Sequence, residues 1–147
     1  LIEFIRSCLD EFQVPPQLIA FELTECAFST DSYDSLKIIN KLDEMGCKIA
    51  LDNFGKGSSS INHLKVFPIS LVKIDKSLMP ENLDDSQNMA LIKGLTLMLQ
   101  LLERDIVAEG IETKAQISVC AELGINKAQG FFFSKAKSID DIKLEYL

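Results

Sequence analysis

Three acidic residues and one lysine carry the strongest chemical signal in the sequence. Glu22, Asp52 and Glu109 stand near the ends of short apolar segments, and Lys73 lies in another such segment. Three carboxylates that converge repel one another unless a cation joins them. Oxygen ligands of this kind suit Mg²⁺ or Mn²⁺ rather than zinc. A lysine in the same ring would neutralise charge as it develops on a phosphate, so the pattern points to metal-assisted phosphoryl chemistry.

Short apolar segments must position these groups, and they alternate with helix signals. A helical pattern starts at Leu1 and stops at Pro15 and Pro16. Five predicted strands follow, at 18–25, 47–53, 70–75, 105–112 and 127–133. Because strands that alternate with helices form parallel βαβ units, the carboxyl ends of all five strands should meet at one edge of a sheet.

Capping signals define the helices between the strands. Thr30 or Asp31 is expected to cap the helix after the first strand, and Thr113 with Gln116 has the form of a capping box. A short helix is expected before Pro68, a long one over 86–103, and a last one capped at residue 138. The long helix is apolar nearly all round over 91–102, which predicts that it is buried or forms an interface.

The strand pattern leaves two α/β architectures, an open doubly wound sheet and part of a (β/α)₈ barrel. No GxGxxG or GxxxxGK[ST] loop follows the first strand, which removes the main signal for the open sheet. A whole barrel takes about 250 residues. We therefore expect five βα units of a TIM-type barrel, with two open sheet edges, in a piece cut from a longer protein.

Composition excludes several other classes of protein. Lys plus Arg number 15 and Asp plus Glu 22, a formal charge of −7, which argues against a DNA-binding protein. The four cysteines form no CxxC motif, which points to reduced thiols rather than a zinc site. His63 is the only histidine, and no GxSxG elbow supports a Ser-His-Asp triad. No apolar stretch is long enough to span a membrane.

Several of these residues also have plain structural interpretations. Glu25 and Glu112 could be acids that stabilise a helix N-terminus, and Gly55 and Gly57 could serve only a turn. Lys73 could face solvent, or it could act as the Schiff-base amine of an unrelated barrel lyase. His63 is expected to have a surface or packing role. The three phenylalanines at 131–133 should alternate between the barrel interior and the helix layer.

Five motifs resemble, in order, the ELTE, DDFG, KID, AEGxET and QG motifs of EAL domains, which are barrel phosphodiesterases that cleave cyclic di-GMP. The matching segments are FELTE at 21–25, IALDNFGKGSSS at 49–60, VKIDKS at 72–77, VAEGIET at 107–113 and QGFFFS at 129–134. Each motif is weak alone, but five in the right order over nearly the whole chain are specific. The resemblance implies that the chain is the C-terminal portion of a single EAL domain.

The resemblance implies catalytic and metal-binding roles for five residues. Glu22 and Asp52 match metal ligands, and Lys73 matches the lysine near the attacking water. Glu109 matches a metal-bound or general-base glutamate. Asn53 stands where the second Asp of DDFG is usual, so it is a degenerate metal position that offers no anionic oxygen to a second ion.

The resemblance also implies residues that shape the substrate site. Glu25 and Glu112 match residues that hold the glycine loop. The positions matched to substrate binding are Gln129, Gly55, Gly57, Ser58 and Asp75. The glycine loop and the tail at 134–137 depart from the family pattern, and the Glu-Ala-Leu strand with the strand after it would lie upstream of Leu1.

The function implied for an intact parent is Mg²⁺- or Mn²⁺-dependent hydrolysis of cyclic di-GMP to linear pGpG. We expect the 147-residue chain alone to be inactive. The alternative is a catalytically degenerate EAL module that binds cyclic di-GMP or a protein partner without turnover. A homodimer, or a partner that completes the barrel, is expected. The implied location is the bacterial cytoplasm, and membrane tethering of the parent stays open.

Overall fold

One parallel sheet organises the chain in the computed structural model, which describes residues 1–24, 32–56 and 61–146. Its strands are β1 (Ala20–Thr24), β2 (Lys48–Phe54), β3 (Leu71–Ile74), β4 (Asp105–Ala108) and β5 (Lys127–Ala128). They lie side by side in chain order, so β1 and β5 are the edges. A doubly wound sheet would reverse its strand order at a switch point. The unreversed order is that of a barrel segment and confirms the expected α/β fold class.

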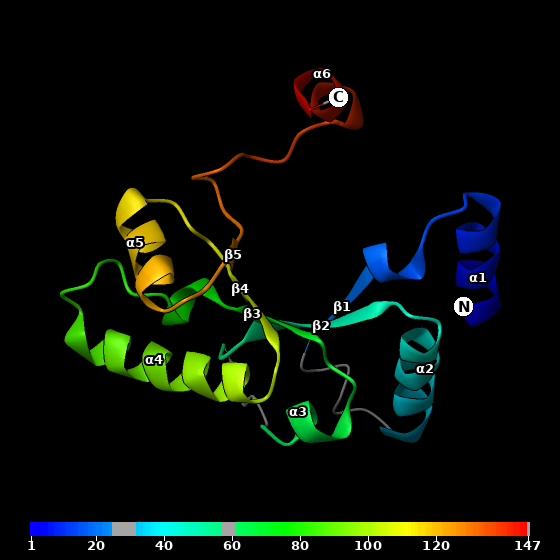
Figure 1. Cartoon of the computed structure of the whole chain (residues 1–147), viewed down its shortest axis with the longest axis horizontal. Coiled ribbons are helices and arrows are strands. Elements are labelled where there is room, and N and C mark those ends of the chain that lie inside the picture. The colour runs from blue at the N-terminus through cyan, green and yellow to red at the C-terminus, as the bar shows by residue number, and fades with distance from the viewer. Residues whose placement is uncertain (25–31, 57–60, 147) are drawn as a thin grey trace.

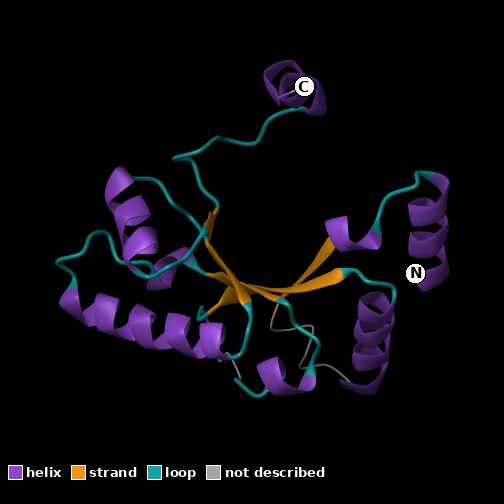
Figure 2. Ribbon diagram, viewed as in Figure 1, coloured by secondary structure: helices purple, strands orange, loops and turns teal. Residues whose placement is uncertain are grey.

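Helices follow the strands as the sequence predicts. They are α1 (Ile2–Glu11), α2 (Ser32–Glu44), α3 (His63–Val66), α4 (Ser86–Leu101), α5 (Lys114–Glu122) and α6 (Ile139–Tyr146), with 3₁₀ turns η1 (Pro16–Leu18) and η3 (Lys76–Leu78). Figures 1 and 2 show α2, α3 and α4 along one side of the sheet and α6 set apart at the end of an extended segment. None of the helices in the described part of the chain has the length and hydropathy of a membrane-spanning segment.

Two of the predicted helix caps are confirmed. Thr113 accepts a hydrogen bond from the backbone of Gln116, and the Gln116 side chain accepts one in return from the Thr113 backbone. Ser138 accepts a hydrogen bond of 3.2 Å from a backbone N–H in the first turn of α6. The cap predicted at Thr30 or Asp31 lies outside the described residues. These local bonds fix where the helices begin and therefore how the loops leave the strands.

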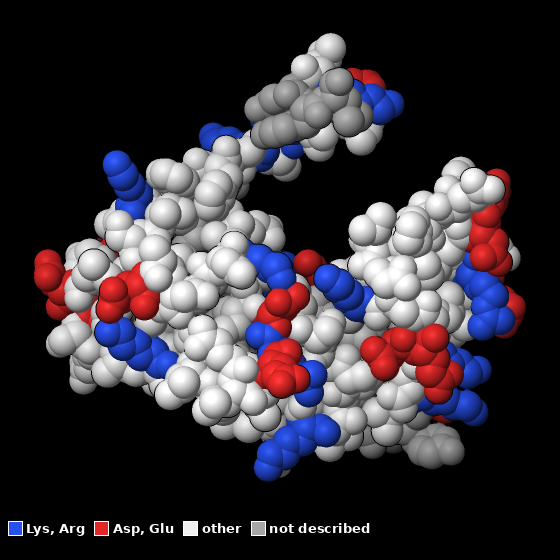
Figure 3. Space-filling model, viewed as in Figure 1, with Lys and Arg blue, Asp and Glu red and all other residues white. Residues whose placement is uncertain are grey.

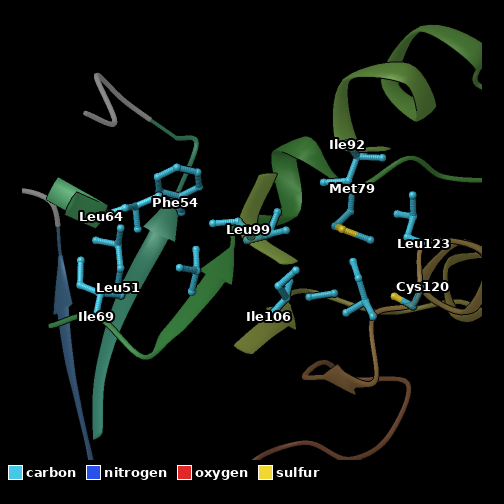
Figure 4. Close-up of a cluster of buried hydrophobic side chains, with 14 of the residues drawn as sticks. Leu51, Phe54, Leu64, Ile69, Met79, Ile92, Leu99, Ile106, Cys120 and Leu123 are labelled. Carbon is cyan, nitrogen blue, oxygen red and sulfur yellow. The ribbon is translucent and has the colours of Figure 1, made fainter. Parts of the chain in front are cut away.

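Strand alternation divides the sheet into a buried face and a polar face. The buried face carries apolar residues of β2, β3 and β4, namely Ile49, Leu51, Val72, Ile74, Ile106 and Ala108. Helix residues that pack in the same core include Ile39, Leu42, Leu64, Ile92, Leu99 and Val119. Figure 4 shows this cluster between the strands and the helices. The helices thus bury one face, and the opposite face is left to the ionisable residues.

The long helix α4 is both buried and apolar on its outer side. Met89, Ile92 and Leu99 are buried, which confirms one of the two expectations for this helix. Leu97 and Leu101 remain 57% and 76% exposed. They line an open groove of about 370 Å³ beside Ile61, Lys65 and Gly94. The apolar outer side is the part of α4 that the second expectation, an interface, would use.

The prediction for 131–133 is wrong. All three phenylalanines are exposed, at 67%, 45% and 55%, rather than alternating between two layers. The strand ends at Ala128, and the backbone then turns, with the N–H of Phe133 donating to the carbonyl of Gly130 at 3.1 Å. A side chain at Gly130 would overlap the backbone of Ile111, so only glycine fits at this turn without a backbone shift.

The structure agrees with the packing role predicted for His63. Its ring packs edge-on against the Phe67 ring at 5.9 Å within α3 and the turn that follows. Charged side chains show no concentration of one sign on the face seen in Figure 3, where basic and acidic groups are interspersed.

Two glycine substitutions test the close approach of Gly130 to the backbone of Ile111. Gly130→Ala should lower the free energy of unfolding by about 1–3 kcal/mol, because the new methyl group overlaps the backbone of Ile111. Gly94→Ala is the matched control: no atom lies within 4 Å of the added methyl group in α4, so helix propensity should raise stability by about 0.5–1 kcal/mol. Denaturant unfolding followed by circular dichroism measures both. Equal effects of the two substitutions would contradict the close approach at Gly130.

Candidate active site

Strand register brings the four chemical residues to one face of the sheet. Glu22 is paired with Ala50, and Thr24 with Asp52, so Glu22 and Asp52 point to the same side. Lys73 is paired with Val107, two residues before Glu109. Since side chains alternate along a strand, all four project from the polar face near the carboxyl ends of β1 to β4. In parallel α/β folds this edge is where active sites lie.

Lys73 is the centre of the cluster. Its Nζ lies 2.9 Å from Oε2 of Glu22, 3.2 Å from Oδ1 of Asp52 and 2.8 Å from Oε1 of Glu109. Glu22 comes from β1, Asp52 from β2, which adjoins β3, and Glu109 from the position directly after β4 on the other side of β3. The structure therefore brings together the four residues that the sequence singled out.

The three carboxylates determine the charge of Lys73. Its side chain is buried, and burial alone would lower the pKa of Lys73 because it penalises the charged form. Hydrogen bonds to Glu109, Glu22 and Asp52 outweigh burial, so the pKa of Lys73 is raised above its ordinary value. The group is an ammonium at neutral pH. A Schiff-base reaction needs the neutral amine, so this environment disfavours the lyase alternative.

A bulge in β2 shapes the side chains next to Lys73. Leu51 is paired with Val72 and Phe54 with Ile74, so two β2 residues stand opposite Lys73 alone. These two residues are Asp52 and Asn53, and Asn53 has a φ of 56°. Its Nδ2 donates to Oδ2 of Asp52 at 2.6 Å.

This hydrogen bond is the feature that sequence reasoning missed. The sequence predicts Asn53 only as a degenerate metal position, whereas in the structure its amide donates a hydrogen bond to the neighbouring carboxylate. The available signal was the residue type, since asparagine adopts positive φ more readily than most residues, and the glycine that follows favours a turn. The hydrogen bond itself depends on the register of β2 against β3.

Asp75 and Gly55 lie where β2 and β3 end. Asp75 is 7% exposed, and its Oδ1 accepts a hydrogen bond of 2.9 Å from the backbone of Ser77, capping η3. Hydrogen bonding to Ser77 lowers the pKa of Asp75, so it is a carboxylate. Gly55 has a φ of 95°, and a side chain there would collide with Leu78. Gly55 begins the glycine loop, whose Gly57 and Ser58 lie outside the described residues.

The remaining predicted site residues are less tightly placed. Gln129 is exposed and uses its backbone, with its N–H donating to Ala108 at 2.8 Å and its carbonyl accepting from Ile111 at 3.0 Å. Glu112 is exposed and directly precedes Thr113, the N-cap of α5. With Glu81 it lines a pocket of about 420 Å³. Glu25 lies outside the described residues. The roles predicted for these three stay predictions.

The donor set decides whether a metal fits. Glu22, Asp52 and Glu109 offer only carboxylate oxygens, which is the chemistry that Mg²⁺ and Mn²⁺ select. Within 1–24, 32–56 and 61–146, no three His, Cys, Asp or Glu side chains are spaced to hold a metal by themselves. The three carboxylates instead close on the ammonium of Lys73. The chemistry of the three residues therefore fits an oxygen-bound divalent ion, although in this structure they are spaced around the Lys73 ammonium.

Comparison with known proteins gives a consistent result. The family model of the EAL domain matches residues 1–136. The signaling protein YkoW of Bacillus subtilis is 37% identical over 135 residues, which are 92% of this chain and 17% of that protein. The cyclic di-GMP phosphodiesterase RocR of Pseudomonas aeruginosa is 35% identical over 135 residues, 92% of this chain and 34% of that protein. The chain thus spans about a sixth and about a third of the length of these two relatives.

Solved structures agree with the sequence relatives. A c-di-GMP complex of the PaMucR phosphodiesterase superposes with a TM-score of 0.84 at 34% identity, covering 97% of this chain and 57% of that one. The EAL domain of Mycobacterium smegmatis DcpA gives 0.88 at 25% identity, covering 97% and 64%. The strand order, the motifs and the family match lead to one conclusion: this chain belongs to the EAL-domain family.

Proposed function

We propose that the intact protein containing this chain hydrolyses cyclic di-GMP to linear pGpG. The observation that carries the proposal is the ammonium of Lys73 within 3.2 Å of carboxylates from β1, from β2 and from the residue after β4. Relatives named as cyclic di-GMP phosphodiesterases, and the c-di-GMP complex of PaMucR, support the choice of substrate. The 147 residues alone, with both sheet edges open, are proposed to give no turnover.

Glu22, Asp52 and Glu109 are the proposed ligands of one Mg²⁺ or Mn²⁺ ion. When bound, such an ion polarises a phosphate oxygen and lowers the pKa of a coordinated water. Glu22 has a side chain that is 52% exposed, whereas the side chains of Asp52 and Glu109 are 20% and 17% exposed. Glu22 therefore has the most freedom to adjust its contact when a ligand enters.

Lys73 and Glu109 have complementary proposed roles. Lys73 holds a fixed positive charge at the polar face, where it neutralises negative charge that develops on the phosphodiester. Glu109 lies 2.8 Å from that ammonium and is the proposed acceptor of a proton from the attacking water. The water oxygen bonds to phosphorus, the bond from phosphorus to one ribose oxygen breaks, and that oxygen leaves as a hydroxyl with the proton that the water gave up, so the ring opens at a single phosphodiester.

The rim residues are proposed to hold the glycine loop and the dinucleotide. Glu25 and Glu112 are assigned to the loop, as in the family motifs. The proposed dinucleotide contacts are Gln129, Gly55, Gly57, Ser58 and Asp75. Asp75 supports this assignment most directly, because its cap on η3 fixes the backbone beside Lys73.

The chain is proposed to be the C-terminal portion of one EAL domain, acting in the bacterial cytoplasm. Its relatives are bacterial and much longer than the segment they share with it. The edges β1 and β5 are where further strands would complete the barrel. The exposed leucines of α4 are the surface on which a homodimer would form.

A second candidate is a degenerate EAL module that binds cyclic di-GMP or a protein partner without turnover. Asn53 favours it, because this position supplies an amide where the family motif has a second aspartate. The intact Lys73 cluster favours hydrolysis.

Product analysis separates the two candidates. The full-length natural protein with cyclic di-GMP and Mn²⁺ should form pGpG, and excess EDTA should stop product formation because the carboxylates then lack their ion. Liquid chromatography measures the product, and calorimetry measures binding in parallel. Binding without any pGpG would identify the degenerate module, whereas product formation unaffected by EDTA would contradict the metal-dependent mechanism.

Lys73→Met tests the ammonium directly. Loss of a group that stabilises transition-state charge should lower turnover about 10²–10³-fold. Lys48→Met, at the exposed start of β2, is the matched control and should leave turnover unchanged. Initial rates of pGpG formation give both values. A Lys73→Met variant that is folded and as active as the Lys48→Met variant would refute the role of Lys73.

A further inference from the structure

The two oxygens of Asp52 are held by different donors. Oδ1 lies 3.2 Å from Nζ of Lys73, and Oδ2 accepts the amide N–H of Asn53 at 2.6 Å. The Asp52 side chain is only 20% exposed, so water competes weakly for either bond. A carboxylate that is fixed at both oxygens has little freedom to rotate.

The bulge makes this arrangement possible. In a regular strand, neighbouring side chains point to opposite faces, so Asn53 would point away from Asp52. The extra β2 residue opposite Lys73 and the left-handed backbone of Asn53 remove that alternation. Bulges of this kind re-aim side chains near active sites.

We propose that Asn53 is a positioning residue, whose amide fixes the Asp52 carboxylate as a ligand of the divalent ion. The inference rests on the proposed function, because it takes Asp52 as a ligand. It changes the interpretation of Asn53 from a lost ligand to a donor that orients its neighbour. Hydrogen-bond partners of metal ligands commonly act in this way.

Metal binding by glycine and histidine variants tests the proposal. Asn53→Gly keeps the left-handed backbone and removes the amide, so affinity for Mn²⁺ alone should fall about 10–100-fold. Asn53→His tolerates positive φ and retains a donor, so its affinity should lie closer to that of the wild type. Asn126→Gly, in the exposed loop before β5, is the matched control and should bind as the wild type does.

The measurements are calorimetric titration with Mn²⁺ and the metal-free melting temperature, both on the full-length natural protein. A weaker Asn53→Gly with an unchanged melting temperature, rescued by Asn53→His, supports the proposal. Unchanged affinity in Asn53→Gly, a loss that only follows the melting temperature, or no rescue by Asn53→His would overturn it. A wild type that binds Mn²⁺ without forming pGpG would refute hydrolysis alone, so the two failures are distinguishable.

Discussion

The ion cluster around Lys73 is the interaction on which the rest of the site depends. A lysine that is only 5% exposed would lose its charge unless carboxylates surrounded it, and three carboxylates close together would repel one another without a cation. The carboxylates keep the buried lysine charged, and the lysine offsets the repulsion among the carboxylates. The cluster therefore ties β1, β2 and β4 to β3 through charge as well as through backbone pairing.

The sheet makes this cluster possible by dividing its two faces. The helices bury the apolar face, and the ionisable side chains are confined to the other one by strand alternation. Parallel strands then place the carboxyl ends of all five segments along a common edge. Four ionisable side chains, at positions 22, 52, 73 and 109, thus come together at this edge of the sheet, and each lies in a strand or directly after one.

Patterns that depend on local chemistry could be predicted from the sequence. The capping pair Thr113 and Gln116 formed as expected, because a cap needs only residues three positions apart. The four residues of the cluster could be singled out because parallel strands leave little choice about where their ends lie. The family motifs pointed to the same residues.

Features that depend on the spacing between strands could not be predicted. The bulge at Asn53 arises from the register of β2 against β3, which residue type alone does not specify. The phenylalanines at 131–133 have the composition of a strand, but β5 ends at Ala128 and the chain turns at Gly130, which lies close to the backbone of Ile111. Both features are set by segments distant in the sequence.

The most direct test of the central claim is the position of the divalent ion. A crystal structure of the full-length protein with Mn²⁺ and cyclic di-GMP would locate it by its anomalous scattering. The ion should lie within bonding distance of the Glu22, Asp52 and Glu109 carboxylates, with the Lys73 ammonium beside it. An ion bound elsewhere, or these carboxylates turned away from Lys73 and the dinucleotide, would contradict the account.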